Sequence, residues 1–315
     1  MTIGNNGARL ISVVVCTYRR QSYLRRALAS LVTQSLDKAR YEVLVVDNAC
    51  DDDVRLLASE YSTQAQVSYV PEPTLGLASA RNTGARRASG EYIAFIDDDG
   101  MASPSWLSEI AAAFARHGPH VAAVGGPIDL VWEATRPGWL TDDLLPPLGH
   151  LDRGAAPREL GGTEWLFGGN MAFKASALKE AGGFSTGLGR IGKSLLSNEE
   201  LLIQRELDGR GYARLYDPAV LVWHHVPAGR LTPEWFMRRF YWQGVSEALT
   251  FRLSDHAGLL RRVRNAGVDS AALVRSPAEI KALAGSILKR GQTKDLPVRC
   301  RALRHLGLIR GWLTQ

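Results

Sequence analysis

The alternation of apolar runs with amphipathic segments in the first hundred residues is the feature that most restricts the fold of this chain. Runs rich in β-branched residues, which predict buried strands, occur at 10–18, 41–48, 67–70 and 92–97. The segments between them have apolar residues in helical spacing, as at Leu24, Leu28 and Leu31. Strands and helices in this alternating order predict an α/β fold with a mainly parallel sheet that helices cover on both faces.

Polar residues follow three of these predicted strands at their carboxyl ends. They are Thr17, Tyr18 and Arg19 after the first strand, Asp47 and Asn48 after the second, and Asp97, Asp98 and Asp99 after the strand at 92–97. Each group alone is compatible with an ordinary polar turn. Because ligands of open α/β sheets bind outside the carboxyl ends of the strands, the three groups together predict one binding site at that edge.

The acidic triplet Asp97–Asp99 indicates a metal site within that edge. Adjacent carboxylates disfavour one another's ionisation unless a cation lies among them, and Mg²⁺ or Mn²⁺ is commonly held by one or two carboxylates plus phosphate oxygens. A solvated acidic turn is the alternative, which the position after a buried strand disfavours. Haloacid dehalogenase-type phosphatases also place Asp-x-Asp after a strand, but they require Thr or Val where this chain has Met101.

The periodic pattern changes twice along the rest of the chain. Residues 127–162 are rich in Pro and Gly and lack periodicity, which is typical of binding loops or lids. Strands are predicted again within 165–174 and 219–225, with a helix that begins near Asn198. Beyond Pro233 the segments are long and helical, so we expect a first domain at 1–230 and a helical region at 231–315.

The positive charge of the chain is concentrated at its C-terminal end. The net charge is +6, yet residues 252–315 contain 13 Lys or Arg against 4 Asp or Glu. Three roles remain open for this region: a helical cap on the α/β domain, peripheral contact with an anionic membrane, or a contact in a homodimer. Nucleic-acid binding is disfavoured, because the basic residues are not interleaved with aromatics as in single-strand platforms.

Cysteine usage and hydropathy point to the cytoplasm. The three cysteines are few, odd in number and not spaced as metal pairs, which favours reduced thiols. The first residues lack the pattern of a secretory signal, and no run of about 18 apolar residues is present to span a bilayer. We therefore expect a cytoplasmic protein, with attachment to the inner face of the membrane as the alternative.

Several blocks of the sequence resemble family 2 glycosyltransferases with the GT-A fold. In order, they are SVVVCTYRR, VLVVDNACDDD, LGLASARNTGARRASGEYIAFIDDD, FGGNMAF and SNEELLIQR with WHH. They extend over about residues 10–230, and the segment from SNEELLIQR to WHH looks closest to bacterial polysaccharide-type members. The resemblance implies a Rossmann-like sheet and a metal-dependent, inverting transfer from a nucleotide-sugar, such as a UDP-sugar. The implied acceptor is a hydroxyl of a saccharide, a lipid-linked saccharide or a secondary metabolite.

The resemblance also implies roles for individual residues. The nucleotide would be held by Thr17, Tyr18, Arg19, Asp47, Arg81, Asp97 and Asp98. Mn²⁺ or Mg²⁺ would be held by Asp99 and His224, and His225 is less suited because its side chain should point to the opposite face of its strand. Sugar or acceptor contacts are expected from Gly169, Asn170, Trp139 and Glu200.

The catalytic base is where the sequence departs from the family pattern. The family's Glu-Asp pair corresponds here to Asn198 and Glu199, so Glu199 is the expected base and Glu200 the alternative. One base without a second positioned carboxylate predicts a single displacement with inversion. The missing Glu leaves a second hypothesis, a nucleotide-sugar-binding protein without catalysis.

Overall fold

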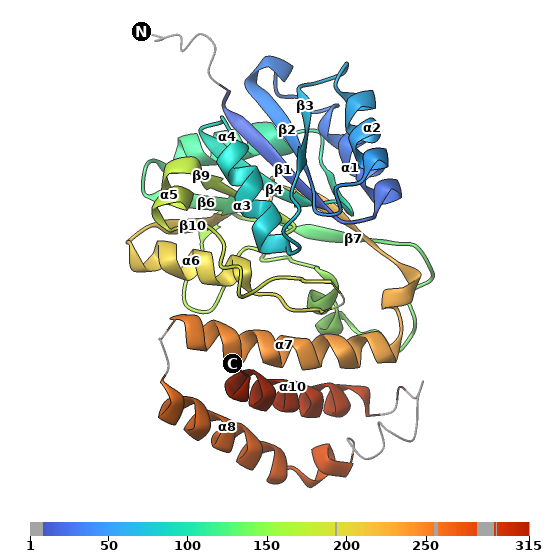
Figure 1. Ribbon diagram of the computed structural model, residues 1–315, viewed down its shortest axis with the longest axis vertical. Coiled ribbons are helices and arrows are strands. Elements are labelled where there is room, and N and C mark those ends of the chain that lie inside the picture. The colour runs from blue at the N-terminus through green and yellow to red at the C-terminus, as the bar shows by residue number, and fades with distance from the viewer. Residues whose placement is uncertain (1–8, 193, 255–257, 282–292, 294, 315) are drawn as a thin grey trace. The chain divides into compact units, whose positions relative to one another are not determined.

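The main element of the fold is a large mixed sheet (Figure 1). The computed structural model describes residues 9–192, 194–254, 258–281, 293 and 295–314. Within this part of the chain, eight strands lie in the order β3-β2-β1-β4-β9-β6-β10-β8. Their bounds are Ile11–Thr17 (β1), Tyr41–Asp47 (β2), Val67–Pro71 (β3), Tyr92–Asp97 (β4), Val121–Gly125 (β6), Arg158–Glu159 (β8), Asn170–Lys174 (β9) and Ala213–Tyr216 (β10).

The register of the first strands brings the predicted polar strand ends together. β1 pairs in parallel with β2 and β4, with Thr17 opposite Asp47 and Cys16 opposite Asp97. β3 extends this parallel group, whereas β9 runs antiparallel between β4 and β6, and β8 is an antiparallel edge strand. The prediction of a mainly parallel sheet is confirmed, with β9 and β8 as the exceptions.

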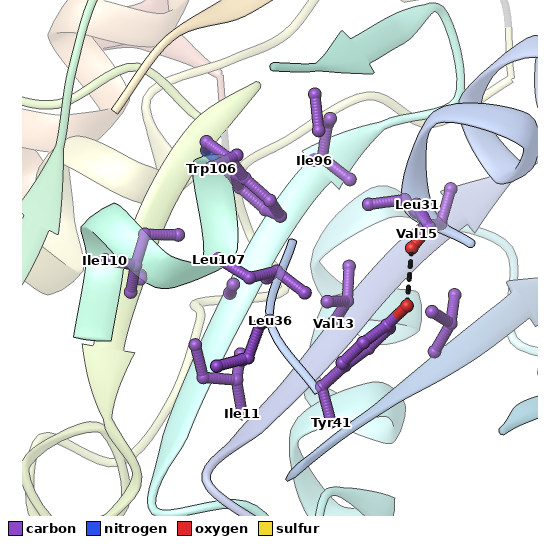
Figure 2. Close-up of a cluster of buried hydrophobic side chains, with 14 of the residues drawn as sticks. Ile11, Val13, Val15, Leu31, Leu36, Tyr41, Ile96, Trp106, Leu107 and Ile110 are labelled. Carbon is purple, nitrogen blue, oxygen red and sulfur yellow. Dashed lines mark hydrogen bonds between the residues drawn. The ribbon is translucent and has the colours of Figure 1, made fainter. Parts of the chain in front are cut away.

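Side chains alternate between the two faces of this sheet, and each face buries its own set of helices. Val13 and Val15 of β1 pack with α1 (Gln21–Leu31), α2 (Asp52–Tyr61) and α4 (Trp106–His117). Figure 2 shows this cluster, where the Tyr41 hydroxyl donates to the carbonyl of Leu31 at 2.9 Å. Val14 points to the other face, toward α3 (Leu77–Arg87) and α5 (Ala175–Glu180). The predicted cover of helices on both faces is confirmed.

A small second sheet joins distant parts of the sequence. It has the order β5-β11-β7, with bounds Gly100–Ala102 (β5), Ile128–Trp132 (β7) and Val222–Val226 (β11). β5 begins directly after the acidic triplet and pairs antiparallel with β11, so that His224 lies opposite Gly100. This pairing places His224 next to the end of β4.

The chain separates into two compact units. The first contains residues 1–131, 149–186 and 203–225, and the second contains 132–148, 187–202 and 226–315. The eight-stranded sheet and the acidic triplet belong to the first unit. The domain boundary that the sequence places near residue 230 stays a prediction.

The second unit contains three long helices within the described residues: α7 (Pro233–Ser254), α8 (Leu259–Val274) and α10 (Leu296–Leu313), with α10 packed against the other two. At the α7–α10 contact a Cβ on Gly244 would lie 2.0 Å from the Arg304 carbonyl oxygen, so the two backbones touch there. Parts of the basic C-terminal region, 255–257 and 282–292, lie outside the described residues. Among the helices described, none has the length and apolar character to cross a membrane.

Candidate active site

The carboxyl ends of β1, β2 and β4 form a buried polar cluster. The Thr17 hydroxyl donates to Oδ2 of Asp98 at 2.8 Å. Asp47 is fully buried and accepts from the backbone N–H groups of Ala49 and Asp51 at 2.9 and 2.6 Å. The carboxylate of Asp47 therefore shapes the turn that follows β2, and the three strand ends meet as the sequence predicts.

The three carboxylates of the acidic triplet point to different partners. Asp97 is the most accessible, with 39% of its side chain exposed, and it lies 3.3 Å from the guanidinium of Arg81. Asp98 and Asp99 are buried. Asp98 faces Thr17, whereas Oδ1 of Asp99 lies 3.2 Å from Nε2 of His224. Three adjacent residues thus have three separate environments.

Arg20 places a positive charge between Asp98 and Asp99, and the sequence analysis did not identify it. Its Nη1–H donates to Oδ1 of Asp98 at 2.7 Å and its Nη2–H to Oδ2 of Asp99 at 2.8 Å. The guanidinium also stacks over the ring of Tyr23, with 4.5 Å to the centroid. The sequence analysis expected Arg19 to contact the nucleotide and did not consider Arg20; Arg19 is exposed and has a positive φ of 55°. The requirement for a positive charge among the carboxylates was the available signal.

The pKa values of Asp98 and Arg20 are both raised, but the causes differ. Burial is the largest cause that raises the pKa of Asp98, to about 7; the neighbouring Asp99 raises it too, and Arg20 opposes the rise. For Arg20, burial acts to lower the pKa, but the charges of Asp98 and Asp99 outweigh it and hold the pKa well above its ordinary value. The guanidinium therefore stays charged between the two carboxylates.

Arg81, on α3, lines the same site from the other side. It is buried and donates from Nη2 to the carbonyl of Gly168 at 3.0 Å. A Cβ on Gly168 would lie 2.6 Å from that guanidinium, and a Cβ on Gly169 would lie 3.1 Å from the carboxylate of Asp97. The two glycines therefore allow the chain to pass directly beside Arg81 and Asp97.

Asn170, the residue after these glycines, forms its side-chain hydrogen bonds within the protein interior. It is fully buried and bonds to the indole N–H of Trp106 at 2.9 Å and to the carbonyls of Pro127 and Val220 at 3.0 and 2.7 Å. Gly169 lies against Asp97, and Asn170 fixes the neighbouring backbone.

The two histidines of β11 face different groups. Nε2 of His224 points at Asp99, and the ring of His225 lies near Arg26 and Tyr23, with 3.4 Å between Nη1 of Arg26 and Nδ1 of His225. An oxygen of Asp99 and a nitrogen of His224 are therefore the pair that could hold a divalent ion. Within the described residues, no group of three or more His, Cys, Asp or Glu side chains forms a metal cage.

The predicted base belongs to the second unit, whereas the residues described above belong to the first. Glu199 and Glu200 begin α6 (Glu199–Gly209), and Glu199 is 2% exposed. Asn198 before them adopts a φ of 76°, and its amide lies 3.4 Å from the Thr250 hydroxyl. The left-handed residue sets the direction in which α6 begins.

The cluster around Glu199 contains a buried arginine, Arg239. Burial, and secondarily Arg190, lowers the pKa of Arg239 to about 10, while Glu200, Glu247 and Glu199 act to raise it. Trp139, also in this unit, is half-buried and packs edge-on against Phe236 with ring centroids 5.4 Å apart. The sequence-predicted residues thus form two groups, one in each unit.

Replacing Arg20 with Met is expected to lower the free energy of unfolding by about 3–5 kcal/mol, because two buried carboxylates lose their cation. Arg25→Met, on the helix α1 that follows Arg20, is the matched control, because Arg25 pairs with Glu60 in an exposed position and should change little. Urea denaturation of the three proteins measures the difference. Equal stability of the two variants would show that Arg20 does not neutralise the triplet.

Comparison with known proteins places the chain in a family. The family model "Glycosyl transferase family 2" matches residues 12–179. The glucosyl-dolichyl phosphate glucuronosyltransferase of Haloferax volcanii is 28% identical over 240 residues, which cover 75% of this chain and 76% of that protein. Some other matched proteins extend well beyond the shared region, which covers 26% of one and 39% of another.

Solved structures show the same fold. The mannosyltransferase PcManGT from Pyrobaculum calidifontis, in complex with GDP-Man and Mn²⁺, aligns with a TM-score of 0.58 and 21% identity over 98% of this chain and 86% of its own. S. aureus TarS 1-349 in complex with UDP-GlcNAc aligns with a TM-score of 0.54 and 16% identity over 93% and 90%. The family model matches more than half of the sequence, so the chain belongs to glycosyltransferase family 2 and is an enzyme that transfers sugar from a nucleotide-sugar.

Proposed function

We propose that the enzyme is an inverting, metal-dependent glycosyltransferase whose metal binds between Asp99 and His224. The observation that carries this proposal is the 3.2 Å approach of Oδ1 of Asp99 to Nε2 of His224, beside the strand ends. Carboxylate oxygens suit both Mn²⁺ and Mg²⁺, and imidazole nitrogen is a common ligand of first-row divalent metals. When bound, a divalent ion would supply positive charge for the departing diphosphate.

The donor nucleotide would bind on the strand ends next to that pair. We propose direct contacts from the accessible residues Tyr18, Arg19 and Asp97. Thr17, Asp47, Asp98 and Arg81 would act from beneath, because their side chains are buried and hydrogen-bonded within the cluster. The backbone at Gly169 would adjoin the sugar, with Asn170 holding it in place and Trp139 and Glu200 as further candidates on the acceptor side.

Glu199 is proposed as the general base that takes the proton from the acceptor hydroxyl. Its carboxylate is buried at the first turn of α6, in a cluster that also contains Arg239. One proton acceptor is sufficient for a single in-line displacement, which inverts the configuration at the anomeric carbon. Glu200, the next residue, is the competing candidate.

A UDP-sugar donor and a saccharide or lipid-linked acceptor are the proposed substrates, with a small secondary metabolite as the alternative acceptor. The TarS structure contains UDP-GlcNAc, and the Haloferax relative is named for a lipid-linked acceptor. We propose that the enzyme works in the cytoplasm at the inner face of the membrane; the homodimer stays a competing use of its basic helices.

A thermal-shift panel tests the donor and the metal together. UDP, dTDP, GDP and CDP are each added with and without Mn²⁺, and UDP with Mn²⁺ is expected to raise the melting temperature most. A shift that ignores Mn²⁺ for every nucleotide would contradict the metal site, and a larger shift with GDP would contradict the UDP assignment only.

A further inference from the structure

Helix α8 has one face anchored to the protein. Ala266 and Leu273 are buried against the helical core, and the indole N–H of Trp312 donates to Oδ2 of Asp269 at 2.9 Å. Arg262 donates to the carbonyl of Trp312 at 3.0 Å. In Figure 1, α8 lies on the side of α10 away from α7. These contacts fix which side of α8 faces outward.

The outward side of α8 carries an apolar stripe. Leu260, Val263 and Val274 are 89%, 53% and 67% exposed, and Val268 beside them is 63% exposed. Residues at i, i+3 and i+14 lie on one face of a helix, and Gly267 and Ala271 complete the stripe between them. A single exposed apolar residue needs no explanation, but a stripe along four turns marks an interaction surface.

A row of arginines borders this stripe. Arg261, Arg264 and Arg275 each follow a stripe residue by one position, so they lie along one flank, and all three are exposed. The one acidic residue of α8, Asp269, faces the protein, where it accepts from Trp312. The outward surface is therefore apolar along one side and positive along the other, with Val268 among the arginines.

We propose that this surface, formed by Leu260, Val263, Val268 and Val274 with Arg261, Arg264 and Arg275, binds the surface of an anionic membrane. An apolar stripe with basic residues alongside is the pattern of helices that lie in the lipid headgroup region. Each arginine near an anionic surface strengthens binding about fivefold. The surface complements a layer that is apolar inside and negative at its boundary.

A second copy of the chain fits this surface less well. Two copies that met through the stripe would bring their arginine rows into one contact without an outward carboxylate on α8 to face them. Nucleic acid would leave the apolar stripe without a partner. A membrane would bring the enzyme to lipid-linked acceptors, and in that respect alone the inference rests on the proposed function.

Vesicle flotation of the full chain tests the inference. Binding is expected to vesicles of phosphatidylcholine mixed with phosphatidylglycerol and not to phosphatidylcholine alone, and it should weaken as salt is added. The triple variant Arg261→Gln, Arg264→Gln and Arg275→Gln should partition about 100-fold less into the mixed vesicles, from about fivefold for each arginine. Leu260→Gln with Val263→Gln should also lose binding.

Leu56→Gln is the matched control, because Leu56 is an exposed leucine on α2. This variant should bind vesicles like the unchanged chain. The UDP-dependent thermal shift, measured on every variant, verifies folding and tests the donor site separately from the membrane surface. Equal binding to both vesicle types, or unchanged binding by the arginine variant, would overturn the inference. A third outcome would also overturn it: the unchanged chain forms a dimer and does not bind vesicles, and the variant with both Leu260→Gln and Val263→Gln is a monomer.

Discussion

Glu199→Gln is expected to lower the rate of sugar transfer by roughly 10²–10⁴-fold, the range that general-base assistance usually contributes. Glutamine keeps the size and hydrogen-bonding capacity of the side chain but does not accept the proton of the acceptor hydroxyl. The acid-triplet residues and the nucleotide cluster remain intact in this variant, so the UDP-dependent thermal shift should stay unchanged. Single-turnover transfer from a UDP-sugar measures the effect.

Glu200→Gln is the matched control for this prediction, because it removes the adjacent carboxylate from the same helix turn. We expect it to retain most of the single-turnover rate at saturating acceptor, so that any effect on the acceptor contact appears as weaker acceptor binding. If Glu200→Gln loses transfer while Glu199→Gln keeps it, the base is Glu200. Loss of folding in either variant would be visible as a lower melting temperature without nucleotide.

Asp99→Asn is expected to abolish the effect of Mn²⁺ on UDP binding and to lower kcat/KM by about 10³-fold or more, because a bound ion contributes several kcal/mol of charge stabilisation. An amide at this position is a weaker metal ligand than a carboxylate, and it also removes one of the two carboxylates that Arg20 bridges. Direct Mn²⁺ binding, followed by electron paramagnetic resonance, measures the loss without reference to activity.

Asp97→Asn separates the metal role from the other carboxylates. Asp97 is more exposed than Asp99 and pairs with Arg81, whereas Asp99 is the carboxylate that faces His224. Mn²⁺ binding should therefore persist in the Asp97→Asn variant. Weaker UDP binding with normal Mn²⁺ binding would agree with a nucleotide role. Mn²⁺ binding that disappears in Asp97→Asn and persists in Asp99→Asn would reverse our assignment within the triplet.

Local periodicity was sufficient to predict the first half of the sheet. Val13, Val14 and Val15 fill both faces of β1, as expected for a strand covered on both sides, and this fixed the strands whose ends carry Thr17, Asp47 and Asp97. The antiparallel insertion of β9 between β4 and β6 did not follow from the sequence. Its pairing joins segments about 80 residues apart, and no local pattern encodes a partner at that distance.

The site was predictable to the level of strand ends and not to the level of side-chain partners. Arg19 and Arg20 are equivalent in the sequence, but the positive φ at Arg19 turns the chain so that Arg20 reaches Asp98 and Asp99. Asn170 next to a Gly-Gly turn looked available to a substrate, yet its amide is buried under Trp106. Both outcomes depend on backbone direction, which residue types alone do not specify.

The backbone contact at Gly244 has a practical consequence for studies of the C-terminal region. Because α10 packs closely on α7, with the two backbones in contact at Gly244, removing α10 would expose Val245 and Ala248 of α7, which are now buried. A chain without α10 would then bind lipids and self-associate through this newly exposed apolar surface, independently of α8. Point substitutions on the outward side of α8 keep this helical scaffold whole and give the cleaner experiment.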